Sequence, residues 1–73
     1  MSELSIRSEI TGTVWKVLVE PGQKLAEGDI LVILESMKME IPVIAEDGGT
    51  VRDIKVKEGD AIDEGQVVAV LDV

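Results

Sequence analysis

Apolar residues along this chain fall into short runs separated by turn residues, a pattern typical of β-strands. Two runs, at residues 14–19 and 51–56, are rich in β-branched residues and end in turn sequences that contain glycine. Two others, at residues 30–34 and 66–71, are nearly continuous apolar stretches. Periodicity alone does not separate a buried strand from a buried helix, but short β-branched stretches between turn residues and charged residues favour strands.

Shorter segments complete the predicted set of strands. Residues 4–8 and 41–45 are expected to be strands, and Pro42 restricts the second to a sheet edge or a strand end, because proline cannot donate a ladder hydrogen bond. Residues 23–25 and 60–62 could each add a few paired residues. The pattern therefore predicts an all-β fold in which about eight short strands form two antiparallel sheets, arranged as a flattened barrel or sandwich.

The two halves of the chain repeat each other. An offset of about 37 residues aligns Gly12-Thr13-Val14 with Gly49-Thr50-Val51, and the repeat covers about residues 4–35 and 41–72. Two similar halves that close one small core usually do so around an approximate two-fold axis. We therefore expect internal pseudo-two-fold symmetry, with the chain termini at one pole and the segment that joins the halves at the other.

Apolar spacing in two of the strands departs from strict alternation. In residues 51–56 the apolar positions are separated by three residues and then by two, and residues 14–19 repeat this spacing. An extra residue in one strand produces such a slip, so we predict a β-bulge or bend early in each of these strands.

Composition limits the chemistry that this chain can perform. Its 73 residues are expected to form one complete domain spanning residues 1–73, with an aliphatic core, because Trp15 is the only aromatic residue. The sequence contains no cysteine and no histidine, which removes disulfides, most zinc sites and imidazole-based catalysis. No pair of acids is placed for general acid/base work. We therefore expect neither catalytic residues nor a metal site.

Charge narrows the choice of partner. The formal net charge is −8, from 15 acidic and 7 basic residues, and it opposes binding to nucleic-acid phosphates and to anionic membranes. The sequence has no apolar run long enough to span a membrane and no N-terminal secretion signal. We expect a cytoplasmic protein that is monomeric in isolation and whose partners are proteins with basic docking surfaces.

The segment that joins the two halves has an unusual sequence, Glu35-Ser36-Met37-Lys38-Met39-Glu40. A two-residue hairpin turn centred on Met37 and Lys38 would need positive φ angles, which suit Asn-Gly far better than these side chains. Each residue would then carry strain of about 1–3 kcal/mol, of the kind that collects at functional sites. In the alternative interpretation, Lys38 is a solvated turn lysine and the methionines fill gaps in the core.

Residues 35–39 carry a resemblance to a known family. Glu-Ser-Met-Lys-Met is similar to the Glu-Ala-Met-Lys-Met attachment motif of biotinyl domains, with Ser36 where alanine is usual. Gly28-Asp29 and Gly49-Thr50-Val51 also resemble the biotin/lipoyl attachment family, and the similarity extends over about residues 4–72. The most similar types are the single-domain biotin/lipoyl attachment proteins and the biotinyl domain of biotin carboxyl carrier proteins. The resemblance implies a flattened barrel of two four-stranded antiparallel sheets with the lysine on an exposed hairpin.

The same resemblance implies a function. Lys38 would be biotinylated by a biotin protein ligase, and Glu35, Ser36, Met37 and Met39 would form the recognition motif. The attached biotin would act as a swinging arm that carries CO2 between a biotin carboxylase and a carboxyltransferase. The chain itself would be a non-catalytic carrier in a biotin-dependent carboxylase or transcarboxylase system.

Two other functional classes stay open. The turn at residues 19–22 leaves no room for the protruding thumb of some biotin carriers, and lipoyl domains share the acidic residue at the position of Glu35. Lipoylation of Lys38 by a lipoyl ligase, alone or in addition to biotinylation, is therefore an alternative, although Met37 and Met39 favour biotin. The third class is an unmodified interaction module.

Three residues outside the motif's centre allow two interpretations each. Trp15 aligns with Arg52 in the repeat, so it occupies a position that tolerates solvent; it could pack in the fold or belong to a surface patch for a partner. Glu35 and Glu40 could steer a basic ligase surface towards the hairpin, or could be no more than a solvated, charged strand end.

Overall fold

The computed structural model describes residues 2–73, which form eight β-strands and, within that range, no helix. The strands are β1 (Glu3–Arg7), β2 (Gly12–Val17), β3 (Lys24–Leu25), β4 (Ile30–Ser36), β5 (Met39–Ile44), β6 (Gly49–Ile54), β7 (Ala61–Ile62) and β8 (Val67–Asp72). The described part of the chain accordingly contains no helix that could cross a membrane.

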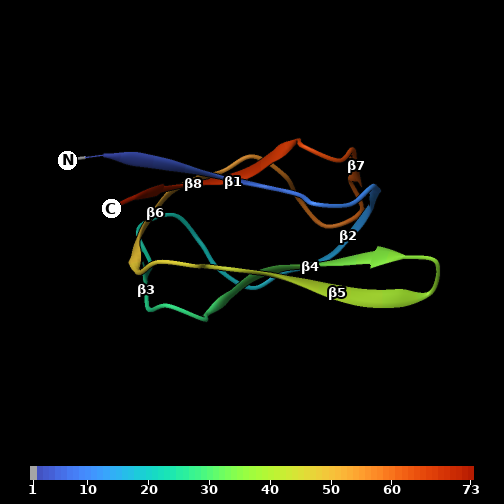
Figure 1. Cartoon of the computed structure of the whole chain (residues 1–73), viewed down its shortest axis with the longest axis horizontal. Helices are drawn as coiled ribbons and strands as arrows, with labels where there is room; N and C mark the ends of the chain where they lie inside the picture. Colours follow the sequence, from blue (N-terminus) through green and yellow to red (C-terminus); the bar gives the residue numbers. More distant parts are fainter. Residues whose placement is uncertain (1) are drawn as a thin grey trace.

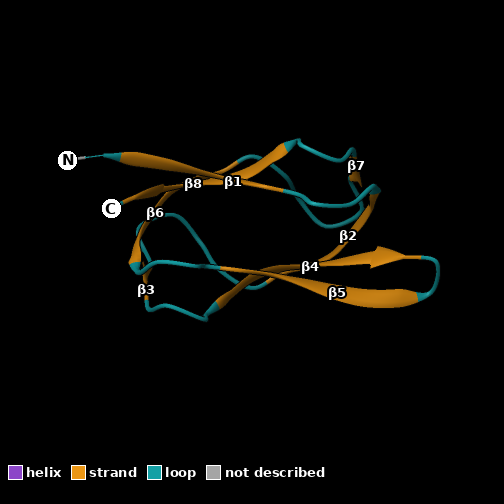
Figure 2. Cartoon of the chain, in the orientation of Figure 1, coloured by secondary structure: helices purple, strands orange, loops and turns teal. Residues whose placement is uncertain are grey.

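The strands form two four-stranded antiparallel sheets that face each other (Figures 1 and 2). Their orders are β1-β8-β6-β3 and β5-β4-β2-β7, which confirms the predicted all-β sandwich. Pro42 lies in β5 at the edge of its sheet, as its missing N–H requires. Of the predicted domain span 1–73, Met1 lies outside the described residues.

The strand ends differ from the predicted ones by up to two residues. β2 and β6 begin at Gly12 and Gly49, and each starts and ends two residues before the apolar run that predicted it. Backbone hydrogen bonds to a neighbouring strand define where a strand begins and ends. A strand can therefore include polar residues and glycines that lie outside the apolar run. After β2 ends, the N–H of Leu18 still donates to the carbonyl of Leu31 at 2.9 Å.

The sequence repeat appears in the structure as pseudo-two-fold symmetry. Replacing β1–β4 by β5–β8, and the reverse, converts the strand order of one sheet into that of the other, so each sheet contains strands from both halves. Ser36 faces Met39 in the hairpin, and at the equivalent position the backbones of Ser2 and Val73 exchange hydrogen bonds of 3.3 and 2.9 Å. The hairpin and the termini lie at opposite ends of a molecule 36 Å long, as predicted (Figure 1).

The space between the sheets is filled by aliphatic side chains. Leu31, Leu34 and Leu71 have no exposed surface, and burying a leucine side chain contributes about 1.5–3 kcal/mol. Ser8 is the buried polar residue of the described chain; its hydroxyl donates to the Ile10 carbonyl at 2.6 Å and accepts from the Ile10 N–H at 3.2 Å. This packed core holds the hairpin strands in a fixed position.

Both predicted bulges are present. The pairing of β2 with β4 shifts register around Trp15, and the pairing of β6 with β8 shifts around Arg52. A second symmetric pair of shifts, around Leu31 in β4 and Val68 in β8, was not predicted. These two residues lie in nearly continuous apolar runs, where inward and outward positions look alike, so the sequence gives no sign of the slip.

Candidate functional site

A two-residue turn formed by Met37 and Lys38 joins β4 to β5. Both residues have positive φ angles, 53° and 65°, and Ser36 pairs directly with Met39 across the turn. Positive φ at both central positions is the type I′ geometry that asparagine and glycine normally supply. For other residues this conformation costs roughly 1–2 kcal/mol each. The tight, strained turn predicted from the sequence is thus confirmed.

The pairing of the two strands forces this conformation on the turn. β4 pairs with β5 from Ile30 and Ile44 up to Ser36 and Met39, and on its other side β4 pairs with β2. Leu34 of β4 is fully buried, which anchors the hairpin on the core. With both strands held, only two residues remain to close the gap, and they must adopt the turn that matches the strand twist.

The side chains at the tip project into solvent. Met37 and Met39 are 92% and 63% exposed, and Lys38 is also exposed. The alternative in which the methionines fill gaps in the core is therefore wrong. Within residues 2–73, no hydrogen bond or ion pair engages the Lys38 amine. The amine is available to react.

The structure brings the predicted site residues together on one hairpin. Lys38 and Met37 form the turn, Ser36 and Met39 flank it, and Glu35 pairs with Glu40 one position further from the tip. Ser36 is half-buried, while both glutamates are exposed. The amine of Lys38 therefore stands above two uncompensated carboxylates, which favours the approach of a positively charged surface.

Sequence analysis missed the part that Gly12 plays at the base of the hairpin. A Cβ atom at this position would lie 2.5 Å from the backbone oxygen of Glu35 and 3.4 Å from the Cβ of Ser36, so β2 approaches the hairpin more closely than any side chain allows. Gly49 repeats the arrangement, with the Asp72 oxygen at 2.6 Å. The repeat did carry the signal, because it aligns these two glycines inside strands, where glycine is otherwise unfavourable.

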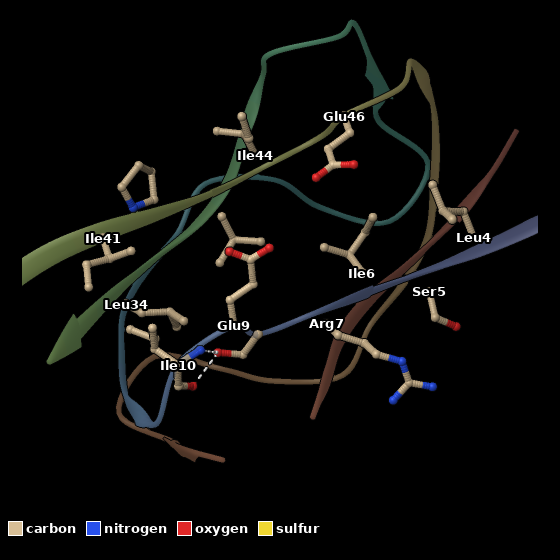
Figure 3. Close-up of a pocket in the computed structure, with 13 residues that line it drawn as sticks. Leu4, Ser5, Ile6, Arg7, Glu9, Ile10, Leu34, Ile41, Ile44 and Glu46 are labelled. Carbon is tan, nitrogen blue, oxygen red and sulfur yellow. Dashed lines mark hydrogen bonds between the residues drawn. The ribbon is translucent and has the colours of Figure 1, made fainter. Parts of the chain in front are cut away.

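The described chain offers no second site of comparable chemistry. Within residues 2–73, no three potential metal-ligating side chains come together. A groove of about 530 Å³ runs between the edge strands β1 and β5; apolar side chains such as Ile6 and Ile41 line it together with Arg7, Glu9 and Glu46 (Figure 3). None of the turn residues lines this groove.

A small β-sandwich that presents one free lysine at the tip of a strained hairpin defines a class of attachment domains. The family model described as "Biotin-requiring enzyme" matches residues 5–71. The chain therefore belongs to the biotin/lipoyl attachment family.

Curated relatives agree with this assignment. The chain is 58% identical over 40 residues to "Biotinylated protein TB7.3 homolog" of Mycolicibacterium smegmatis, covering 55% of this chain and 56% of that protein. It is 43% identical over 43 residues to "Biotin/lipoyl attachment protein" of Bacillus subtilis, covering 59% of each. The match thus spans little more than half the length of these relatives.

The fold is also similar to a solved structure. The Kluyveromyces lactis urea carboxylase superposes with a TM-score of 0.91 at 37% identity, over 97% of this chain and 6% of that one. Nearly the whole chain thus corresponds to one small segment of a large enzyme.

Proposed function

We propose that this chain is a covalent biotin carrier and that Lys38 is the residue biotinylated. The observation that carries the proposal is the turn of Met37 and Lys38, two residues with positive φ. It presents a free amine at the end of the 36 Å long molecule opposite the chain termini. Natural sequences keep such strain where function requires it. The names of the relatives, which include biotinylated proteins and a biotin-dependent acyl-coenzyme A carboxylase subunit, support biotin as the cofactor.

The chemistry assigned to Lys38 is a single acyl transfer. The neutral amine attacks the carbonyl carbon of biotinyl adenylate in the active site of a biotin protein ligase. A C–N amide bond forms, the C–O bond to phosphate breaks, AMP leaves, and the amine loses a proton to the ligase or to solvent. Lysine suits this role because it is a nucleophile on a flexible stem and its amide product is stable.

The carrier contributes position rather than catalysis. Lys38 would hold biotin, which when bound would supply the means of carrying a carboxyl group between a biotin carboxylase and a carboxyltransferase. The rigid sandwich keeps the attachment point exposed, and the packed core beneath β4 prevents the hairpin from folding back. Ligase, carboxylase and carboxyltransferase are the partners that this role requires, and a reducing cytoplasm is where we expect them to meet.

Intact mass measurement tests the assignment. The purified chain, incubated with biotin, ATP and a biotin protein ligase, should gain the mass of one biotinyl group. Lys38→Arg should gain none, while its melting temperature stays close to that of the wild-type chain, because an exposed turn side chain contributes little to the core. Labelling that persists in Lys38→Arg would move the site to another lysine, and an unmodified wild-type chain would contradict the proposal.

Lipoylation of the same lysine is the second candidate. The name of the Bacillus subtilis relative includes both cofactors, but the Mycolicibacterium smegmatis relative is named for biotin alone, so biotin is the favoured cofactor. The same experiment with lipoate and a lipoyl ligase should leave the mass unchanged if Met37 and Met39 select biotin. A lipoyl adduct on Lys38 would show that one hairpin accepts both cofactors.

A further inference from the structure

The two sheets have equivalent outer faces that differ in chemistry. We call the outer surface of β5-β4-β2-β7 the hairpin face and that of β1-β8-β6-β3 the opposite face; the repeat relates each position on one to a position on the other. At four positions an apolar residue on the hairpin face replaces a polar one on the opposite face: Trp15 for Arg52, Leu18 for Lys55, Ile44 for Arg7, and Pro42 for Ser5. Apolar residues on the hairpin face thus occupy the positions of three cationic residues on the opposite face.

Several large apolar side chains of the hairpin face are exposed. Ile33 faces Pro42 and Ile30 faces Ile44 across β4 and β5, so their side chains are direct neighbours in adjacent rows. The apolar patch consists of Trp15, Leu18, Ile30, Ile33, Pro42 and Ile44, and its large exposed members are 43% (Trp15), 48% (Leu18), 39% (Ile30) and 46% (Ile44) accessible. Exposed apolar side chains that gather on one face mark interaction sites more often than isolated exposed residues do.

A row of two acids separates the apolar patch from Lys38. Glu35 and Glu40 face each other across β4 and β5, and like charges directly opposite on a sheet repel. The equivalent acids on the opposite face, Asp72 and Glu3, also face each other. There, however, Arg52 bridges both, with its Nη1 at 2.8 Å from Glu3 and at 3.2 Å from Asp72.

The hairpin face has the acids without the bridging cation. Trp15 occupies the position of Arg52, and no ion pair within residues 2–73 involves Glu35 or Glu40. The nearby Lys16 ammonium lies over the Trp15 ring, 5.5 Å from its centroid, instead of pairing with the acids. The hairpin face therefore complements a protein that presents an apolar surface next to an arginine or a lysine.

We propose that the hairpin face is the surface on which the biotin protein ligase docks, with a basic ligase side chain between Glu35 and Glu40 and an apolar ligase surface on the apolar patch. This inference rests on the proposed function. Lysine has a stem of only about four carbons, so its amine enters an active site only if the body of the carrier comes close. The ligase must therefore contact the carrier surface beside the hairpin. The biotinylated arm is longer, so the biotin carboxylase and the carboxyltransferase need not approach the carrier as closely.

A second copy of this chain is a poorer occupant of the same face. Each copy has a net charge of −8, and pairing two hairpin faces would bring four uncompensated glutamates together. Such repulsion opposes self-association.

Ligase kinetics test the proposal, because the repeat itself supplies the substitutions. The triple variant Trp15→Arg, Leu18→Lys and Ile44→Arg gives the hairpin face the residues of the opposite face, which the same fold accommodates. Its KM as a ligase substrate should rise by about ten-fold or more, with kcat changed less than about two-fold, because docking is weakened while the lysine hairpin stays intact.

A second variant separates apolar contact from charge. The triple variant changes the net charge from −8 to −5 by adding three cations, which would by itself weaken attraction to a basic ligase. Trp15→Ser, Leu18→Ser and Ile44→Thr leave the charge unchanged and should also raise KM by several-fold. The control on the opposite face is Arg7→Ile with Lys55→Leu, which changes the net charge from −8 to −10 and should leave KM at or below the wild-type value. Circular dichroism melts verify that all variants fold.

The outcomes distinguish this inference from the proposed function. A raised KM in both hairpin-face variants, with no rise in KM for the opposite-face control, supports the docking surface. An unchanged KM in the charge-neutral variant overturns it, even if the cationic variant is impaired, because steering alone would then account for the loss. A wild-type chain that the ligase does not label at all overturns the proposed function instead.

Discussion

At the scale of single residues, close backbone approach is the feature that most limits substitution. Gly12 and Gly49 have no room for a methyl group, because each lies under a backbone carbonyl that is fixed in the neighbouring strand. A flexible side chain could move aside, but a ladder carbonyl moves only with its strand. The two sites are equivalent in the repeat, yet only Gly12 lies beside the hairpin.

We predict that Gly12→Ala and Gly49→Ala each lower the free energy of unfolding by about 1–3 kcal/mol, the usual cost of overpacking. Urea denaturation measures this loss. Thr13→Ala, an exposed neighbour in β2, is the control and should cost less than about 0.5 kcal/mol. Because Gly12 contacts the base of the hairpin, its variant should also slow biotinylation, whereas Gly49→Ala should not. Equal labelling rates would show that the hairpin tolerates displacement of β2.

At the scale of elements, the hairpin turn that presents Lys38 lowers the stability of the fold. Two residues with positive φ occupy a turn whose preferred sequence is Asn-Gly, and both neighbouring strands hold them there. The strain is tolerated because the paired strands and the buried core beneath β4 outweigh it.

Replacing Met37-Lys38 by Asn-Gly should therefore stabilise the fold while removing the attachment site. Relief of left-handed strain of about 1–2 kcal/mol at each of the two positions should raise the free energy of unfolding by about 2–4 kcal/mol. Each kcal/mol corresponds to a rise of about 4–8 °C in melting temperature for a domain of this size. Met39→Asn is the matched control, since Met39 is exposed without positive φ, and it should bring no gain. A variant that melts at or below the wild-type temperature would show that the turn is not strained.

The strands and their arrangement were the features that the sequence predicted best. The 37-residue repeat predicted eight strands and the two poles. The bulges around Trp15 and Arg52 were predictable because polar residues between the apolar ones make the slip in spacing visible. The repeat could not reveal the bulges around Leu31 and Val68, where every neighbour is apolar. The exposure of Trp15 and the missing cation between Glu35 and Glu40 depend on register across strands, which the sequence alone does not fix.

At the scale of the whole molecule, net charge opposes folding. Fifteen acids and seven bases share a surface only 36 Å long, and the ion pairs of the described residues lie on the opposite face, around Arg52 and between Lys55 and Asp53. The Lys55 ammonium hydrogen-bonds Asp53 at 2.7 Å and lowers the pKa of that carboxyl. Exposed pairs of this kind contribute little to the free energy of unfolding, so repulsion among the excess acids should dominate.

Salt should therefore stabilise this chain. The Debye length falls from about 30 Å at 0.01 M to about 3 Å at 1 M ionic strength, which screens the repulsion of the folded state more than it weakens a few exposed pairs. Raising sodium chloride across that range should raise the melting temperature by several degrees. Glu27→Gln with Asp47→Asn lowers the charge excess at two exposed positions, so this variant should melt higher at low salt and gain less from added salt. A melting temperature that falls with salt would show instead that the ion pairs around Arg52 outweigh the net charge.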